Sequence, residues 1–77
     1  MQVLLFAGLA ESCGGRTLDV PVDAPLTVQA LRDAAEQRCP RLVGQRFRVA
    51  VNARYAADDA CVPADAEVAF LPPVSGG

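Results

Sequence analysis

The sequence contains no histidine, and this absence limits the chemistry that its own side chains can perform. Histidine is the commonest side chain for general acid–base catalysis near neutral pH and the commonest metal ligand. The three cysteines, Cys13, Cys39 and Cys61, are odd in number and widely spaced, and they fit neither a disulfide framework nor a metal site. An ordinary hydrolase built from this chain alone is therefore not expected, and no bound metal or cofactor is expected.

The sequence also lacks lysine and tryptophan, and all seven of its basic residues are arginines. The formal net charge is −2 and the arginines are scattered, so a nucleic-acid partner is not expected. No apolar run approaches membrane-spanning length, and Met1 leads into a short apolar run without a basic start, so neither a membrane segment nor a signal peptide is expected. The cysteines are interpreted as free thiols in a reducing compartment, which predicts a cytoplasmic location.

What the chain does have is apolar residues, at 52% of its length, which is enough for the core of one small domain. The periodicity of residues 25–40 predicts a helix, with Thr27 as its N-cap and Pro40 as its stop. Period-two and apolar patterns predict strands over residues 1–8, 16–22, 45–52 and 67–71.

Two shorter features complete the order of elements. A helical turn is expected after the first strand, ended by Gly14 or Gly15 in the left-handed conformation, and a short strand is expected near Tyr55. One helix across one face of a mixed sheet is a two-layer α+β domain, and this order predicts the β-grasp, or ubiquitin-like, fold. The first and last strands are expected to be central, parallel neighbours, and Pro21 is expected to place the second strand at an edge.

A single helix covers only one face of the sheet, so strand parity divides the apolar residues into two sets. In the first strand, Val3, Leu5 and Ala7 point to one side. The residues expected to pack between sheet and helix are Val3, Leu5, Leu18, Val20, Val28, Leu31, Ala35, Val49, Val51, Val68 and Phe70. The opposite face carries Leu4, Phe6, Ala50, Ala69 and Leu71, edged by Gln2, Arg48 and Glu67, with Tyr55 joining from the short strand. An apolar patch with a charged rim is typical of a docking site.

The last six residues form a separate unit in this interpretation: a domain over residues 1–71 is followed by a flexible C-terminal tail over residues 72–77. Two prolines favour an extended arm, and the following side chains shrink toward two glycines that can enter a narrow channel. These residues are Pro72, Pro73, Val74, Ser75, Gly76 and Gly77. The unhindered α-carboxylate of Gly77 can be coupled to AMP, and a sulfur nucleophile can then form a thioester, an acyl persulfide or a thiocarboxylate.

The segments LLFAGLAESCGG, LTVQALRD, VAVNARYA and DAEVAFLPPVSGG resemble the MoaD family, the small subunit of molybdopterin synthase. The resemblance covers nearly the whole chain, and its most specific part is the ending from Glu67 to Gly77. It implies a sulfur carrier that is the non-catalytic subunit of molybdopterin synthase, with no catalytic side chains of its own. It also implies that the hydrophobic sheet contacts of the family fall on Phe6, Tyr55 and Leu71, with the tail residues inserted into the partner.

The same resemblance implies a set of partners. An ATP-dependent enzyme similar to MoeB would adenylate the Gly77 carboxylate, and a sulfurtransferase would supply the sulfur that converts it into a thiocarboxylate. The tail would then enter a large subunit similar to MoaE, in an expected heterotetramer. There the sulfur would build the dithiolene of molybdopterin, in the biosynthesis of the molybdenum cofactor.

Three other functions remain open at this point. A ThiS-like carrier, or a MoaD-like carrier for another sulfur-containing product, has the same ending and the same fold. A ubiquitin-like modifier would join Gly77 to lysines of target proteins, although a chain without lysine could not build lysine-linked polymers on itself. A plain interaction module would not need Gly77.

Overall fold

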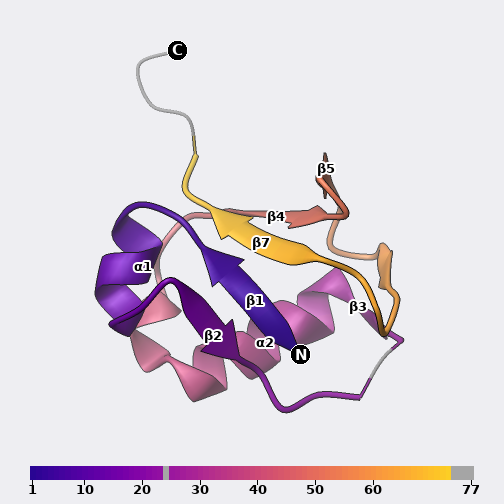
Figure 1. The fold of residues 1–77 in the computed structure, drawn as a ribbon, viewed down its shortest axis with the longest axis horizontal. Helices are drawn as coiled ribbons and strands as arrows, with labels where there is room; N and C mark the ends of the chain where they lie inside the picture. Colours follow the sequence, from indigo (N-terminus) through magenta and orange to yellow (C-terminus); the bar gives the residue numbers. More distant parts are fainter. Residues whose placement is uncertain (24, 74–77) are drawn as a thin grey trace.

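The computed structural model describes residues 1–23 and 25–73 and is shown as a ribbon in Figure 1. In chain order its elements are β1 (Gln2–Leu5), α1 (Gly8–Cys13), β2 (Thr17–Asp19), β3 (Leu26–Thr27), α2 (Val28–Arg38), the 3₁₀ helix η1 (Pro40–Leu42), β4 (Arg48–Val51), β5 (Arg54–Tyr55), β6 (Cys61–Val62) and β7 (Val68–Leu71). The predicted strand, helix and strand order is confirmed.

Five strands form one mixed sheet in the order β2-β1-β7-β4-β5. Strands β1 and β7 are parallel neighbours in its centre, with Leu4 opposite Ala69, and the other pairs are antiparallel. Strand β2 lies at an edge, as Pro21 predicted, but it ends at Asp19 and is therefore shorter than the run over residues 16–22. The topology is that of the β-grasp fold, with a mixed sheet and one main helix, α2.

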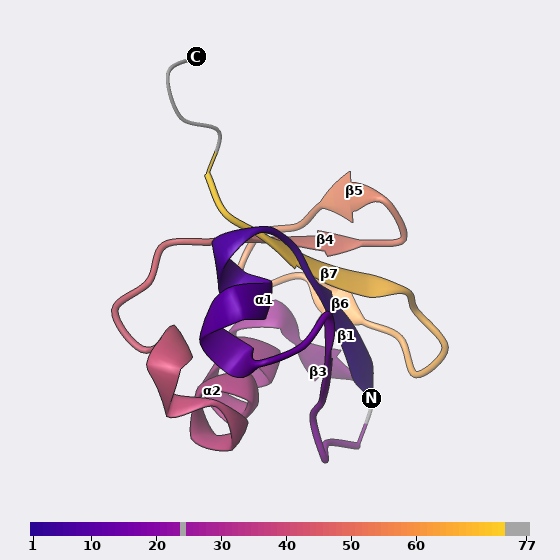
Figure 2. The same cartoon turned by 60° about the vertical axis from the view of Figure 1, so that its left-hand side comes forward.

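Helix α2 lies on one side of the sheet, as the two views in Figures 1 and 2 show. It begins where predicted, because the hydroxyl of Thr27 accepts a hydrogen bond from the backbone N–H of Ala30 at 3.1 Å. The cap at Cys39 is extended, and Pro40 follows it.

The core lies between the sheet and the helical elements. The rings of Phe47 and Phe70 stack with their centroids 4.7 Å apart, and the Arg32 guanidinium covers Phe47 at 4.3 Å. Most residues predicted to face the helix are buried, and Leu18 and Val51 are partly buried against the core. Each fully buried valine, leucine or phenylalanine side chain stabilises the fold by about 1.5–3 kcal/mol, because its apolar surface is removed from water.

The segment over residues 53–66, predicted as a loop with one short strand, contains a further strand. Strand β6 pairs with β3 in a separate two-stranded sheet, with Leu26 opposite Val62. Val62 is fully buried, as are Leu9 of α1 and Leu42 of η1. These three core residues come from segments too short for a periodic pattern to identify.

Strand β1 is shorter than predicted, and Ala7 does not continue its inward side. The strand ends at Leu5, and Ala7 is exposed with φ 51° and ψ −129°. This backbone conformation turns the chain into α1, which ends at Gly14 with φ 76° as predicted.

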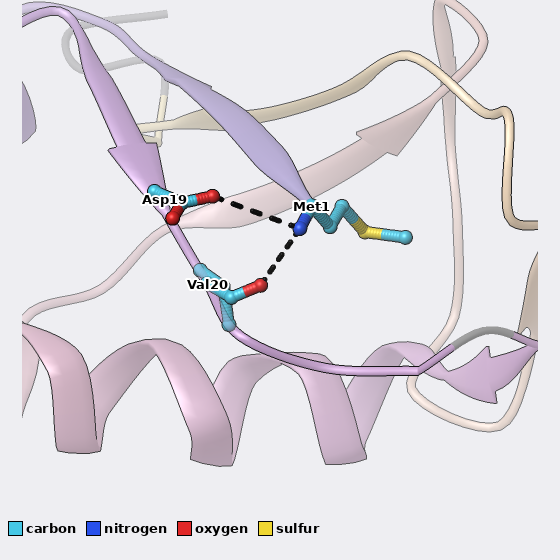
Figure 3. Close-up of polar contacts among 3 residues, drawn as sticks. All are labelled: Met1, Asp19 and Val20. Atoms are coloured by element: carbon cyan, nitrogen blue, oxygen red, sulfur yellow. Dashed lines mark hydrogen bonds and ion pairs between the residues drawn. The ribbon is translucent and has the colours of Figure 1, made fainter.

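Met1 is held at the end of the edge strand β2 by two backbone hydrogen bonds and an ion pair (Figure 3). The amino group of Met1 donates to the carbonyl oxygen of Val20 at 2.8 Å, and the N–H of Val20 donates back to the carbonyl of Met1 at 2.8 Å. The carboxylate of Asp19 lies 3.8 Å from the same amino group. These bonds extend the β1–β2 ladder by one pair and fix the register of β1 in the sheet.

Candidate functional site

The sheet face opposite α2 carries an apolar groove, which we call the outer groove. Its volume is about 280 Å³, and its lining residues are Leu4, Phe6, Ala50, Ala53, Tyr55, Glu67, Ala69 and Leu71. Leu4, Phe6 and Tyr55 are 37%, 46% and 52% exposed and lie on one face as a contiguous apolar patch, which is typical of an interaction site. The strand-parity prediction that placed Phe6 and Leu71 on this face is confirmed, and Ala53 is the lining residue that it missed.

Strand register explains why this face is hollow. Leu4 lies opposite Ala69, Ala69 opposite Ala50, and Ala50 opposite Tyr55, so the four side chains form one row across four strands. The two alanines in the middle of the row make a low floor, and the larger side chains at its ends make the walls. A larger side chain at either middle position would occupy part of the groove.

A second row lies one pleat further along the strands. Arg48 is opposite Leu71, and the N–H of Phe6 donates to the carbonyl oxygen of Phe70 at 3.2 Å, which places Phe6 beside Leu71. This row of Phe6, Leu71 and Arg48 closes the groove at one end. Leu71 is also the last residue of β7, so the chain leaves the sheet from the same row.

The turn between β4 and β5 presents Tyr55 to the groove. Asn52 and Ala53 both have positive φ, at 51° and 67°, which matches the right-handed twist of a two-residue hairpin. The Asn52 side-chain oxygen accepts from the backbone N–H of Glu67 at 2.9 Å, and the Asn52 N–H donates to the Glu67 carbonyl at 2.8 Å. This exchange ties the hairpin to the start of β7 and fixes one wall of the groove.

The groove has one charged residue near each end. Glu67 precedes β7 and lines the groove with an exposed side chain. Arg48 lies at the other end, where its guanidinium carbon is 3.8 Å from the centroid of the Tyr55 ring. The charged rim predicted from the sequence is therefore present, but the stacking of Arg48 on Tyr55 could not be predicted from strand parity.

The predicted tail is described only at its beginning. Pro72 is half-buried, Pro73 is exposed, and the chain at these residues runs away from the sheet in Figure 1. Val74, Ser75, Gly76 and Gly77, which the sequence singled out for the chemistry, lie outside the described residues.

A second groove runs along the other side of β1. Its volume is about 520 Å³, and its lining residues are Leu4, Leu5, Phe6, Ala7, Ala10, Glu11 and Arg16. Leu4 and Phe6 line both grooves, so these two side chains form a ridge between them. A partner that covered the outer groove would also contact this ridge.

All three cysteines are free, as the sequence predicted, but two of them are neighbours in space. The Cys13 thiol lies within hydrogen-bonding reach of the Cys39 thiol, and Cys39 is buried while Cys61 is exposed. Burial, followed by the hydrogen bond with Cys39 and the negative charge of the Cys39 thiolate, raises the pKa of Cys13 to about 12. Cys13 therefore stays protonated at neutral pH and is a poor sulfur nucleophile.

Two further features bear on what the described residues can do. In residues 1–23 and 25–73, no group of three histidine, cysteine, aspartate or glutamate side chains could hold a metal ion. Neither α1 nor α2, the described α-helices, has the length and apolar content to cross a membrane.

Known proteins resemble this chain over its whole length. A family model described as the ThiS family matches residues 3–77. Small archaeal modifier protein 1 of Haloferax volcanii is 38% identical over 87 residues, covering all of both chains. The molybdopterin synthase sulfur carrier subunit of Arabidopsis thaliana is 35% identical over 79 residues, covering all of this chain and 82% of the relative.

Solved structures agree with the fold. The crystal structure of small archaeal modifier protein 1 from Haloferax volcanii has a TM-score of 0.85 at 37% identity, covering 100% of this chain and 98% of the other. A candidate molybdopterin converting factor subunit 1 from Pyrococcus furiosus also has a TM-score of 0.85, at 20% identity, covering 95% of each chain, and supports the fold alone.

Proposed function

The chain belongs to the ThiS family of ubiquitin-like sulfur carriers, and from this premise we propose that the carboxylate of Gly77 is its reactive group. One observation carries the proposal: the outer groove reaches the residue from which the tail starts. Leu71 lines the groove and is the last residue of β7, and the tail begins at the next residue, Pro72. An enzyme that docks on the outer groove receives the tail at its own active site.

The first chemical step is adenylation by an ATP-dependent activating enzyme of the MoeB class. The Gly77 carboxylate attacks the α-phosphorus of ATP, pyrophosphate leaves, and the product is an acyl adenylate. A carboxylate is a poor electrophile, and the adenylate provides the leaving group that it lacks. The step needs no side chain of the carrier, which is consistent with a chain that has no histidine.

The second step introduces sulfur. Hydrosulfide displaces AMP from the adenylate and leaves a thiocarboxylate on Gly77. If a sulfurtransferase persulfide attacks instead, the product is an acyl disulfide, and a further thiol cleaves it to the thiocarboxylate with formation of a disulfide. We assign the supply of sulfur to the partner, because Cys13 is protonated at neutral pH, Cys39 is buried, and the exposed Cys61 lies on β6, outside the five-stranded sheet and the lining of the outer groove.

The acceptor that we propose is the dithiolene of molybdopterin, built inside a large subunit similar to MoaE with which the carrier forms a heterotetramer. The 35% identity to a molybdopterin synthase sulfur carrier subunit supports this acceptor. The carrier residues in contact with the large subunit would be Phe6, Tyr55 and Leu71, followed by the tail residues Pro72, Pro73, Val74 and Ser75, while Gly76 and Gly77 form the reactive end.

A second candidate function is the modification of proteins, in which the activated Gly77 is joined to lysines of targets. The 38% identity to small archaeal modifier protein 1 favours it. Both functions begin with the same adenylation, so they differ in the nucleophile that attacks the activated carboxyl group and displaces AMP: a sulfur nucleophile in sulfur carriage, and a lysine amine in protein modification.

Adenylation is tested by exchange of labelled pyrophosphate into ATP, with the MoeB-class enzyme of the same organism as the probe. Exchange that depends on the carrier and disappears when Gly77 is deleted supports the proposal. Equal exchange with the deleted chain contradicts it.

The two functions are separated by searching cell lysate for lysine adducts. The sequence has no arginine or lysine after Arg54, so trypsin would leave a long remnant on targets. A protease that cleaves after glutamate leaves residues 68–77 attached to lysine, which mass spectrometry identifies. Adducts that require Gly77 support modification, and thiocarboxylate formation without adducts supports sulfur carriage alone.

A further inference from the structure

Arg48 occupies an unusual position at the end of the outer groove. Its guanidinium stacks on the ring of Tyr55 at 3.8 Å, and within residues 1–23 and 25–73 it has no carboxylate or hydrogen-bond acceptor as a partner. Its position opposite Leu71 places it in the row of side chains from which the tail departs. We propose that Arg48 binds a carboxylate on the activating enzyme and thereby sets the orientation in which that enzyme docks.

Stacking on Tyr55 prepares Arg48 for this role. An exposed arginine usually samples many rotamers, and ordering it on binding reduces the gain in affinity. A guanidinium held over an aromatic ring at 3.8 Å is already ordered, and the N–H donors of Arg48 have no acceptor among the described residues, so they remain available for a carboxylate. The planar guanidinium can bind that carboxylate through two parallel hydrogen bonds, which fixes direction as well as position.

The opposite charges of Arg48 and Glu67 near the two ends of the groove favour one orientation of a docked partner. Glu67, just before β7, and Leu71, opposite Arg48, are four residues apart, so the backbone positions of the acidic and basic residues are offset by about 13 Å along the strand direction. The floor between them is formed by Ala50 and Ala69, which carry no charge. A partner that fits this surface has an apolar side chain for the floor, a carboxylate for Arg48 and a cationic or donor group for Glu67.

The activating enzyme is the partner that this surface has to satisfy. Sulfur carriage and protein modification use different acceptors, but both require adenylation of Gly77. A correct docking direction matters most there, because the tail begins beside Arg48 and has to reach the ATP site. Docking in the reverse direction would pair Arg48 with a cation and Glu67 with a carboxylate, and like-charge pairs at an interface oppose binding.

This inference rests on the proposed function, and its test separates the two. The dissociation constant for the MoeB-class enzyme of the same organism is measured at low and at physiological salt for wild type, Arg48→Glu, Arg48→Lys and Arg41→Glu. Arg41 lies on η1, in the helical layer, so Arg41→Glu makes the same change in net charge away from the groove. Thiocarboxylate formation on wild type is followed in parallel, and thermal unfolding confirms that each variant is folded.

The expected result is a loss of affinity of about tenfold or more for Arg48→Glu, a smaller loss for Arg48→Lys, and wild-type affinity for Arg41→Glu. The double variant Arg48→Glu/Glu67→Arg restores the net charge but reverses the two ends of the groove. The inference expects this variant to remain as weak as Arg48→Glu. Its recovery to wild-type affinity would mean that net charge alone matters, and would overturn the inference.

The remaining outcomes are also decisive. If wild type forms the thiocarboxylate and Arg48→Glu binds as tightly as wild type, the role of Arg48 is refuted and the proposed function stands. If Arg48→Glu and Arg41→Glu lose affinity equally, the role of Arg48 is likewise refuted. If wild type neither binds a competent enzyme nor forms the thiocarboxylate, both the role of Arg48 and the proposed function are refuted.

Discussion

The backbone N–H of Phe6 donates to the carbonyl oxygen of Phe70 at 3.2 Å, just beyond the last paired residues of the parallel strands β1 and β7. The two side chains lie on opposite faces of the sheet: Phe70 is fully buried in the core, whereas Phe6 is 46% exposed and lines the outer groove. This bond therefore joins a core residue to a residue of the outer groove, at the point where the tail begins.

The first prediction concerns Phe6→Asp. A carboxylate on the ridge of the outer groove would have to be desolvated when a partner docks, so binding of the activating enzyme should weaken by about tenfold or more. The free energy of unfolding should change by less than about 1 kcal/mol, because the side chain is already in contact with water. Binding is measured by calorimetry and stability by urea unfolding.

Phe70→Ala is the matched control on the buried side of the same bond. It removes a ring that stacks on Phe47, and we expect a loss of about 3–5 kcal/mol of stability, which can unfold a domain this small. If Phe6→Asp unfolds the protein as Phe70→Ala does, Phe6 belongs to the core and the assignment of the two faces is wrong.

The second prediction concerns the floor of the groove. Ala69→Leu places a larger side chain between Leu4 and Tyr55 in the row of four residues, so it should fill the groove without touching the core. Binding of the activating enzyme should weaken by about tenfold, with stability unchanged or slightly raised, because the added leucine packs against existing side chains. Wild-type affinity for a folded Ala69→Leu would show that the partner does not use this floor.

The third prediction concerns backbone strain at Ala7. Its φ of 51° with ψ of −129° is a conformation that glycine adopts readily and that costs a residue with a Cβ atom about 1–3 kcal/mol. Ala7→Gly should therefore raise the free energy of unfolding by about 1 kcal/mol after the extra entropy of unfolded glycine is counted. Loss of stability on this substitution, measured by urea unfolding, would contradict the strained turn between β1 and α1.

The fourth prediction concerns the cysteine thiols. Because burial and the neighbouring Cys39 thiol raise the pKa of Cys13 from 9.0 to about 12, Cys13 in the folded protein should react about thirtyfold more slowly with iodoacetamide than in denaturant at pH 8. The exposed Cys61 should be labelled first. Peptide mapping of partially labelled protein measures both rates.

The stability of the fold and the labelling rate of Cys13 should both depend on pH, with a direction set by the raised pKa of Cys13. The folded-state pKa is above the unfolded value, so the contribution of Cys13 to stability is complete below pH 9 and is lost as the pH rises toward 12. Labelling of Cys13 should therefore keep accelerating over this range. Cys13 labelling as fast in folded as in unfolded protein would show that the thiol is neither buried nor paired.

The larger elements could be predicted because their signals are local. The helix was bounded by Thr27 and Pro40, whose effects depend only on adjacent residues. The two faces followed from strand parity, and the parallel central pair followed from the β-grasp order of elements, with which the apolar content of the first and last strands agrees. Parity therefore predicts the face on which Phe6 and Leu71 lie, and the short strand near Tyr55 adds Tyr55 to it.

The features that could not be predicted from the sequence all depend on contacts between residues that are far apart along the chain. Strand β6 exists because Val62 meets Leu26 of β3, and two-residue strands carry no periodicity of their own. Cys13 and Cys39 are brought together by the packing of α1 against η1. The stacking of Arg48 on Tyr55 needs the side-chain direction across two strands, which parity alone does not supply.

The central claim is that Gly77 is the reactive end of the chain. Its most direct test is the intact mass of the protein after incubation with the activating enzyme, ATP and a sulfur donor. The control is the same chain extended by one residue beyond Gly77, which keeps the domain and every oxidisable side chain. Oxidation of Met1 or a cysteine adds nearly the same mass as replacing oxygen by sulfur, and it would affect both proteins equally.

If Gly77 is the reactive end, wild type gains the mass difference between sulfur and oxygen, the gain requires ATP, and the extended chain gains nothing. A gain that is equal in both proteins, or no gain with an activating enzyme shown to be competent on another carrier, would contradict it.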